Sequence, residues 1–386
     1  MKKYLLIIIS LSSIAFNFCS KNNANVTIEV IAEDLNDSTE VYITGNDEQL
    51  GNWQTDIVKL EKIEKGKWEN TFTFQKGKKL EFKITRGSWA TEIINQDGTS
   101  PENFAFEILN DTLLKINVDL WADQLERKLE GQITGNVKYH RNFSGKGIKP
   151  RDIIVWLPPG YETDTSKKYS ILYMHDGQNI VDPKTSLFRV DWQLDENADT
   201  LILNGFIEPI IIVGIYNTID RDFEYDETEL GRAYLNFIID SLKPFIDRNY
   251  RTKSDRENTA NGGASLGGLI SFILVWEHPD VFSKAICFSP AFKIDNYDFV
   301  DNILSYKGMK KDINIYINNG DNELDSELQP GVDEMINALS FQGYVEKKDF
   351  YFFKAKNSLH GERAWAKNIW RALIYLFGTE KGRALL

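Results

Sequence analysis

The chain has 386 residues, of which 42% are hydrophobic and 26% charged, and its formal net charge is −12. This composition excludes a chain that is disordered throughout, collagen-like or coiled-coil. The acidic balance makes nucleic-acid phosphates a poor partner. Two cysteines, Cys19 and Cys287, are too few for a disulfide framework or a cysteine-rich zinc site. The length predicts two or three folding units with at least one large core.

The first element in chain order is an apolar stretch typical of an export signal. Two lysines precede an apolar run over residues 4–16, which is too short to span a membrane comfortably. Cys19 and a polar, asparagine-rich segment follow. This layout resembles a bacterial lipoprotein signal, which implies that residues 1–18 are a signal peptide, that Cys19 carries lipid and that residues 19–25 form a tether. Cleavage after Ala15 is the alternative; both predict export, and the first predicts anchoring to a bacterial membrane, periplasmic or at the cell surface.

The next region, residues 26–121, consists of short β-branched and aromatic runs separated by Asn, Asp and Gly. These runs lie at 27–32, 40–44, 67–74, 80–85 and 113–118. Several short strands at this spacing predict a small N-terminal β-sandwich domain. The charged residues 122–130 show no strand pattern and are predicted to form a linker.

Part of this region resembles the starch-binding family of carbohydrate-binding modules. A strand-like segment at 41–45 leads into a turn at 49–53 that ends in Gly-Asn-Trp. The resemblance implies that Trp53 stacks on a glucose ring and that Lys83 hydrogen-bonds the sugar, which makes an α-glucan a candidate partner. The family has a second stacking tryptophan after this lysine, and Trp89 is a candidate whose register the sequence leaves open. The alternative is an immunoglobulin-like spacer in which Trp53 is a packing plug.

Residues 131–386 alternate strand-like apolar runs with helical patterns. The runs lie at 153–157, 170–174, 209–215, 285–288, 313–317 and 350–353. Near-continuous apolar strands that alternate with helices predict an α/β domain with a mostly parallel sheet covered on both faces. Cys287 lies in one of these runs and is predicted to be a core residue.

The strongest chemical signal is the pattern Gly263-x-Ser265-x-Gly267, which is typical of a nucleophile elbow. The chemistry needs a serine on a sharp strand-to-helix turn, so that its Oγ projects above the sheet. Glycines on either side let the neighbouring backbone pack without Cβ clashes. A plausible strand precedes the motif and apolar residues at helical spacing follow it, so Ser265 is the predicted nucleophile.

A serine hydroxyl needs a base, and chain order selects among the four histidines. The acid and then the histidine follow a nucleophile elbow in sequence, which leaves His278 and His360. His278 precedes a proline at the expected end of the helix after the elbow, so His360 is the predicted base. His175 comes before the elbow and is predicted to be a buried structural residue.

The acid that orients the histidine is expected in the loop after the strand at 313–317. A carboxylate there would fix the imidazole and stabilise the imidazolium. Asp321, Glu323 and Asp325 all lie in this loop. The loop composition by itself leaves the choice among them open.

The whole of this domain resembles a family of esterases with the α/β-hydrolase fold, which includes esterase D, feruloyl, acetyl-xylan and siderophore esterases, and mycolyltransferases. The matching segments are 155–161, 172–179, 213–215, 221–225, the serine elbow and His360 to Trp365. The family places its acid at the end of a Gly-x-x-acid turn, which favours Glu323. The resemblance also implies that the backbone N–H groups of Gln178 and Leu266 form an oxyanion hole. Arg221 and Tyr225 are predicted to line the substrate cleft.

These features predict an exported serine esterase that hydrolyses carboxylic esters through an acyl-enzyme on Ser265. The module beside the domain makes an ester on a carbohydrate the expected substrate. Siderophore ester hydrolysis and acyl transfer are alternatives that use the same residues. A noncatalytic glycan-binding surface lipoprotein is an alternative of another class. The sequence carries no zinc-protease, P-loop or dinucleotide motif, so no metal or organic cofactor is expected.

Overall fold

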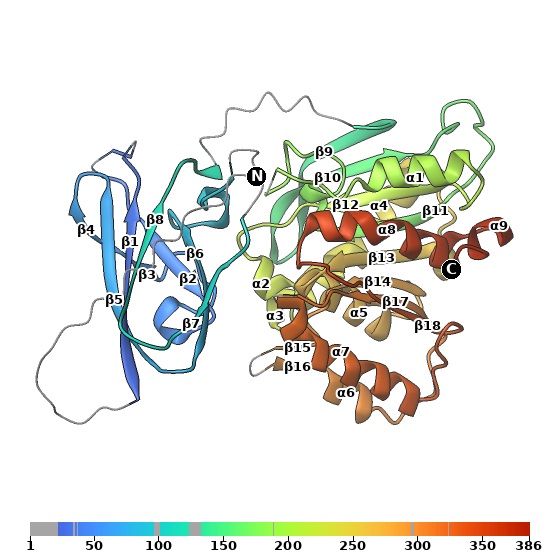
Figure 1. The fold of residues 1–386 in the computed structure, drawn as a ribbon. Helices are drawn as coiled ribbons and strands as arrows, with labels where there is room; N and C mark the ends of the chain where they lie inside the picture. The colour runs from blue at the N-terminus through green and yellow to red at the C-terminus, as the bar shows by residue number, and fades with distance from the viewer. Residues whose placement is uncertain are drawn as a thin grey trace, which may run out of the picture. The chain divides into compact units, whose positions relative to one another are not determined.

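The structure is a computed structural model that divides near residue 130 into two compact units (Figure 1). It describes residues 22–33, 35–36, 38–95, 101–122, 133–187, 189–294, 297–322 and 324–386. The predicted signal peptide, Cys19, nearly all of the predicted linker and Glu323 lie outside these residues. Within the described ranges, no helix is long and apolar enough to cross a membrane.

The first unit is a sandwich of two four-stranded sheets, as the spacing of short strands predicts. One sheet has the order β4-β5-β1-β8 and the other the order β3-β2-β6-β7. The strands are β1 (Asn23–Ile31), β2 (Tyr42–Gly45), β3 (Val58–Lys59), β4 (Glu61–Glu64), β5 (Lys67–Gln75), β6 (Lys79–Thr85), β7 (Phe104–Glu107) and β8 (Thr112–Asn117).

The strand β1 shows why these residues form a sandwich. Val26, Ile28 and Val30 alternate along it, and all three are completely buried. β1 pairs antiparallel with β5 and parallel with β8. Its first residues are already paired, since Asn23 lies opposite Gln75. The predicted tether over 19–25 is therefore too long at its C-terminal end, because the apolar pattern does not reveal polar residues that a partner strand extends.

The second unit contains an eight-stranded sheet in the order β18-β17-β14-β13-β11-β12-β10-β9. Its strands are β9 (Asn136–Gly145), β10 (Ile148–Leu157), β11 (Ser170–His175), β12 (Ile210–Ile215), β13 (Thr259–Ala264), β14 (Lys284–Phe288), β17 (Asn314–Asn319) and β18 (Phe350–Lys354). Six neighbouring strands from β12 to β18 run parallel, whereas β10 pairs antiparallel with both β12 and β9. This confirms the prediction of a mostly parallel sheet.

Helices cover both faces of this sheet. They are α1 (Leu194–Leu203), α2 (Arg221–Glu224), α3 (Glu229–Asn236), α4 (Lys243–Asn249), α5 (Leu266–Glu277), α6 (Val300–Leu304), α7 (Leu324–Phe341), α8 (Glu362–Phe377) and α9 (Glu380–Arg383), with a π-helical segment η5 (Phe237–Leu242) between α3 and α4. Side chains of α3, α4, α5 and α7 pack on one face, and those of α1 and α8 on the other.

Alternation along β11 produces these two cores. Ile171 and Tyr173 belong to the core under α5, whereas Leu172 and Met174 belong to the core under α8. All four side chains are completely buried, so the strand is apolar on both sides. Six of these strands are parallel, and their carboxyl ends therefore meet at one edge of the sheet, where ligands of such folds bind.

Candidate active site

Ser265 lies on a strained turn between β13 and α5. Its backbone has φ 57° and ψ −125°, a conformation that non-glycine residues rarely adopt. The turn is held by hydrogen bonds from the Ser265 N–H to the Phe288 carbonyl (2.9 Å) and from the Ala291 N–H to the Ser265 carbonyl (3.2 Å). Such strain persists at functional sites because the surrounding structure enforces it.

The two glycines of the motif are required by close packing across this turn. A Cβ added to Gly263 would lie 2.7 Å from the carbonyl oxygen of Gly267. A Cβ on Gly267 would lie 3.2 Å from the Asp176 carboxylate. The structure thus places Ser265 where an elbow serine is expected, and its side chain is only partly buried.

His360 lies between β18 and α8 and contacts a buried carboxylate. Its Nδ1 is 2.7 Å from the Asp325 Oδ1, and the exposed fractions of the two side chains are 15% and 1%. The other carboxylate oxygen, Asp325 Oδ2, accepts hydrogen bonds from the Gly320 N–H (2.8 Å) and the Ser289 hydroxyl (3.0 Å). With Nδ1 occupied, Nε2 is the ring nitrogen that remains for proton transfer.

The carboxylate at His360 differs from the one that the turn pattern favours. Glu323 lies outside the described residues, and Asp325 is the carboxylate that bonds the imidazole. Helix α7 begins at Leu324, so Asp325 occupies the first helical turn and faces inward. Asp321 lies elsewhere in the loop and accepts a bond from the Ser358 N–H (3.3 Å). The Gly-x-x-acid pattern favours Glu323 because it counts residues from Gly320 and takes no account of the start of helix α7 at Leu324.

The loop after β11, which carries Gln178, has a constrained backbone. Asp176 adopts the left-handed conformation with φ 55°. Gly177 packs against β12, where an added Cβ would lie 2.3 Å from the backbone of Gly214. The carbonyl of Gln178 accepts a bond from the Thr185 hydroxyl (2.6 Å), which fixes the peptide orientation. Leu266 is the first residue of α5, where backbone N–H groups have no partner within the helix.

Arg221 and Tyr225 hold this loop. The Arg221 guanidinium contacts both oxygens of Asp176 at 2.8 and 2.9 Å. The Tyr225 hydroxyl accepts a bond from the Asp176 N–H (3.2 Å), and the ring is completely buried. Burial alone would raise the pKa of Asp176, but Arg221 and Asn217 outweigh it and hold that pKa below its ordinary value. The prediction that Tyr225 lines the cleft is therefore wrong, because a buried ring in this bond is inaccessible to substrate.

The other three histidines occupy structural positions. His175 is buried, and its Nδ1 lies 2.7 Å from the Tyr234 hydroxyl. Burial lowers the pKa of His175 to about 4, so this residue is neutral near pH 7. His140 bonds the Tyr250 hydroxyl (2.7 Å), and His278 ends α5. Cys287 is a free, buried thiol in β14, as predicted.

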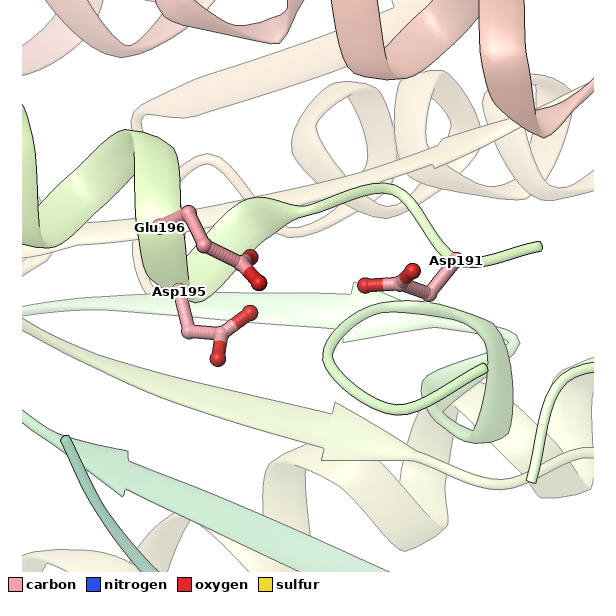
Figure 2. A group of neighbouring side chains, drawn as sticks. All are labelled: Asp191, Asp195 and Glu196. Carbon is pink, nitrogen blue, oxygen red and sulfur yellow. The ribbon is translucent and has the colours of Figure 1, made fainter. Parts of the chain in front are cut away.

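Three carboxyl groups converge before and within α1, as Figure 2 shows. Oxygen atoms of Asp191, Asp195 and Glu196 lie within 4.8 Å of one another. Burial, and then the neighbouring Glu196, raises the pKa of Asp195 to about 9, and burial raises the pKa of Asp191 to about 6. Carboxylates are ligands of hard cations, but a proton shared by Asp195 and Glu196 relieves the same repulsion. The sequence did not indicate this cluster, which forms only when the segment before α1 folds back.

In the first unit, the structure brings Trp53 and Trp89 together. Their ring centroids are 6.5 Å apart with an interplanar angle of 29°, and both rings are partly exposed. Neither indole belongs to the buried core of the unit. The Trp53 backbone has φ 63°, which is strained for a bulky residue. The backbone N–H of Trp53 donates to the Gly45 carbonyl (3.0 Å). Lys83, which lies opposite Thr44 in the same sheet, contacts Glu92 at 3.2 Å.

A polar pocket of about 420 Å³ lies between the segment that leads into β2 and residues of the two loops that carry these tryptophans, although neither indole lines it. A hydrogen bond from the Thr55 hydroxyl to the Gly87 carbonyl (3.4 Å) joins the two loops. The pocket is lined by Thr39, Glu40, Tyr42, Asp56, Arg86, Gly87 and Thr91. Carboxylates, a guanidinium and hydroxyl groups in such a pocket suit the hydroxyl groups of a sugar.

Two family models match separate parts of the chain. Residues 148–376 match the family model described as "Putative esterase", and residues 23–109 match that of the "Starch binding domain". An endo-1,4-beta-xylanase/feruloyl esterase of Xylanibacter ruminicola is 30% identical over 157 residues, which are 38% of this chain and 20% of that protein. This chain therefore spans about a fifth of the length of that relative.

Solved structures share the fold at low sequence identity. A ferulic acid esterase is 20% identical with a TM-score of 0.51, over 63% of this chain and 98% of that one. The enterobactin esterase FES of Shigella flexneri is 11% identical with a TM-score of 0.52, over 93% of this chain and 94% of that one. These likenesses show the fold of the chain.

Proposed function

Because this chain belongs to the esterase family whose model matches residues 148–376, we propose that it is a serine ester hydrolase. The observation that carries the proposal is the bond between the His360 Nδ1 and the buried Asp325 carboxylate. His360 and Asp325 follow Ser265 in the chain, on loops or helix ends at the carboxyl edge of the same sheet. An acid, a base and an elbow serine at this edge are the parts that acyl transfer needs.

In the proposed reaction, the Ser265 Oγ attacks the ester carbonyl carbon while its proton passes to the His360 Nε2. The Asp325 carboxylate orients the His360 ring and stabilises the imidazolium. The negative charge on the carbonyl oxygen is bound by the backbone N–H groups of Gln178 and Leu266. His360 then gives its proton to the leaving alcohol, and an acyl-enzyme remains. Water then attacks the acyl carbon while His360 takes its proton, and His360 returns this proton to the Ser265 Oγ as the acyl bond to serine breaks, which releases the acid and restores the enzyme.

We further propose that the substrate is an ester carried by a carbohydrate. The support is the starch-binding-type module in the same chain, with its paired and partly exposed indoles Trp53 and Trp89. An indole face packs on the apolar face of a sugar ring, and the polar pocket lined in part by residues of the same two loops offers partners for hydroxyl groups. The feruloyl esterase named among the relatives agrees with this substrate class. Export and a lipid anchor at Cys19 belong to the same proposal, and their support is the apolar run over residues 4–16 that precedes this cysteine.

The test of this proposal is ester hydrolysis by the full chain and by Ser265→Ala. Aryl acetates, hydroxycinnamoyl sugars, acetylated sugars and a cyclic triester siderophore form the panel. We expect turnover of at least one carbohydrate ester and a loss of about 10³–10⁶-fold in Ser265→Ala at unchanged melting temperature. Ser326→Ala, in an exposed serine of α7, is the matched control. Equal turnover by Ser265→Ala and the wild type would refute the mechanism, and turnover of the siderophore alone would refute the substrate class.

A further inference from the structure

The carboxylate that bonds His360 is itself held by a chain of two buried side chains. The Trp365 Nε1 lies 3.0 Å from the Ser289 Oγ, which lies 3.0 Å from the Asp325 Oδ2. Ser289 and Asp325 are at most 1% exposed and Trp365 is 7% exposed. This chain of contacts therefore operates out of reach of solvent.

The chemistry of the three groups determines the direction of these hydrogen bonds. An indole N–H can only donate, so the Ser289 oxygen must accept from Trp365. A hydroxyl has one proton, and the Ser289 proton is then free to point at Asp325. Asp325 Oδ2 thus receives one bond from this hydroxyl and one from the Gly320 N–H, while Oδ1 faces His360. A hydroxyl that accepts a bond also becomes a better donor, which strengthens the bond to the carboxylate.

The backbone of Ser289 is built for this contact. Ser289 directly follows β14 and has φ 41°, in the left-handed region that few non-glycine residues adopt. Its N–H donates to the Asn318 carbonyl (2.6 Å) at the end of the neighbouring strand β17. These constraints aim the hydroxyl at the first turn of α7, where Asp325 lies.

Trp365 also contacts the base directly. Its ring lies edge-on to the imidazole of His360, with centroids 5.2 Å apart and an interplanar angle of 81°. It also packs against Trp192, at a centroid distance of 5.2 Å. One indole therefore contacts both the imidazole and, through Ser289, the carboxylate that orients it.

We propose that Ser289 and Trp365 are positioning residues that set the basicity of Asp325 and, through it, the proton affinity of His360. The inference rests on the proposed function, in which His360 is the base. A hydrogen bond donated to a carboxylate stabilises its charge and weakens its hold on a neighbouring cation. Loss of the Ser289 hydroxyl leaves more negative charge at Oδ1, so the imidazolium becomes more stable and His360 gives up its proton less readily.

Other charged groups near His360 stay the same in the variants that test this proposal. Asp321 accepts from the Ser358 N–H, Glu362 accepts from the Asn179 amide (3.3 Å), and Asp176 is paired with Arg221. Arg363, beside Glu362, is exposed. Their fields act equally on the wild type and the variants, so a difference between pH profiles reports the Ser289 bond.

The experiment measures kcat and KM for an aryl acetate between pH 4.5 and 9 in the full chain. In Ser289→Ala we expect the acid limb of kcat/KM to move upward by about half a pH unit or more, and kcat to fall about tenfold to a hundredfold with little change in KM. Trp365→Phe, which keeps an aromatic ring but removes the N–H, should move the limb in the same direction by less. Trp192→Phe is the matched control, an indole in the same cluster without this bond, and should leave the limb in place.

The outcomes separate this proposal from the proposed function. An acid limb that stays in place in both folded variants, Ser289→Ala and Trp365→Phe, overturns the positioning role. An equal shift in Trp192→Phe also overturns it, because packing would then explain the effect. If Ser289→Ala does not fold, the comparison of Trp365→Phe with Trp192→Phe decides. Full activity in Asp325→Asn would instead refute the proposed acid, whatever Ser289 does.

Discussion

The two units of this chain hold the residues of their candidate sites by different means. In the hydrolase unit, Ser265, Asp325 and His360 are held by buried hydrogen bonds, close glycine contacts and strained backbone. In the β-sandwich, Trp53 and Trp89 present partly exposed rings from loops, and both rings lie outside the buried core of the unit. Acyl transfer needs atoms aligned within a fraction of an ångström, whereas stacking on a sugar tolerates a range of positions.

The largest expected effect tests the buried carboxylate. Asp325→Asn should lower kcat by about 10³–10⁴-fold, because an amide neither stabilises the imidazolium nor selects the required tautomer. Asp321→Asn, in the same loop but bonded to the Ser358 N–H, should stay close to the wild type. Steady-state hydrolysis of an aryl acetate measures both. If Asp321→Asn lowers kcat more than Asp325→Asn does, the residue that orients His360 is Asp321. If both variants stay close to the wild type, that residue is Glu323.

A smaller effect is expected at the loop that carries Gln178, whose N–H we propose as an oxyanion donor. Arg221→Lys replaces a two-point contact with Asp176 by a point charge, so the loop loses part of its restraint. We expect kcat to fall about tenfold to a hundredfold and KM to change less, because the oxyanion forms only in the transition state. Arg232→Lys, at an exposed arginine of α3, controls for the substitution itself. A change in KM alone would indicate that Arg221 binds substrate, as the sequence predicts.

The sandwich should lose only binding when its rings are removed. Trp53→Ala and Trp89→Ala in the full chain should each weaken retention in a starch-containing gel by about tenfold, or about 1.4 kcal/mol. Hydrolysis of a soluble aryl ester should be unchanged in both variants. Leu109→Ala, an exposed apolar residue of the same unit, is the control. If the wild type shows no retention, or if Trp53→Ala greatly lowers the melting temperature of the sandwich, the unit is better explained as a spacer in which Trp53 is a packing plug.

The smallest effect concerns the carboxyl cluster before α1 and the pH dependence of stability. The pKa of Asp195, raised to about 9, lies above its value of about 3.9 in an unfolded chain. Between these values the folded state holds more protons than the unfolded state, so stability falls as pH rises.

Asp195→Asn mimics the protonated form and should flatten this fall. The melting temperature of the hydrolase unit at pH 8 should then rise by about 2–4 °C for each kcal/mol recovered, with less change at pH 4.5. Asp199→Asn on the same helix should leave the profile as it is. A flat wild-type profile would contradict the raised pKa.

Local patterns in the sequence were sufficient to predict most of the elements. Short β-branched runs predicted the sandwich, and apolar runs alternating with helical spacing predicted the parallel sheet. The Gly-x-Ser-x-Gly motif predicted the elbow because its residues are neighbours in the chain. The order of serine, acid and histidine then selected His360, because parallel strands bring the loops at their carboxyl ends to one edge.

The errors arose where a residue's role depends on distant partners. The tether prediction extended into β1 because pairing of Asn23 with Gln75 crosses the unit. The sequence predicts Tyr225 in the cleft because it does not reveal the contact of this residue with the Asp176 N–H, which joins segments about fifty residues apart. The pairing of Trp53 with Trp89 likewise depends on two loops that only the folded sheet brings together.

The fold classes, the nucleophile turn and the candidate base could be predicted from sequence because they depend on periodicity and on contacts within a few residues. The carboxylate that meets His360, and the side chains that hold it, follow from contacts that form only in the folded protein. Asp325 reaches the imidazole because α7 begins at Leu324, because Gly320 has no Cβ to block the approach and because Ser289 donates from a third strand end. These hydrogen bonds join three segments that lie far apart in the chain, around residues 289, 320–325 and 360, and no local spacing encodes their meeting.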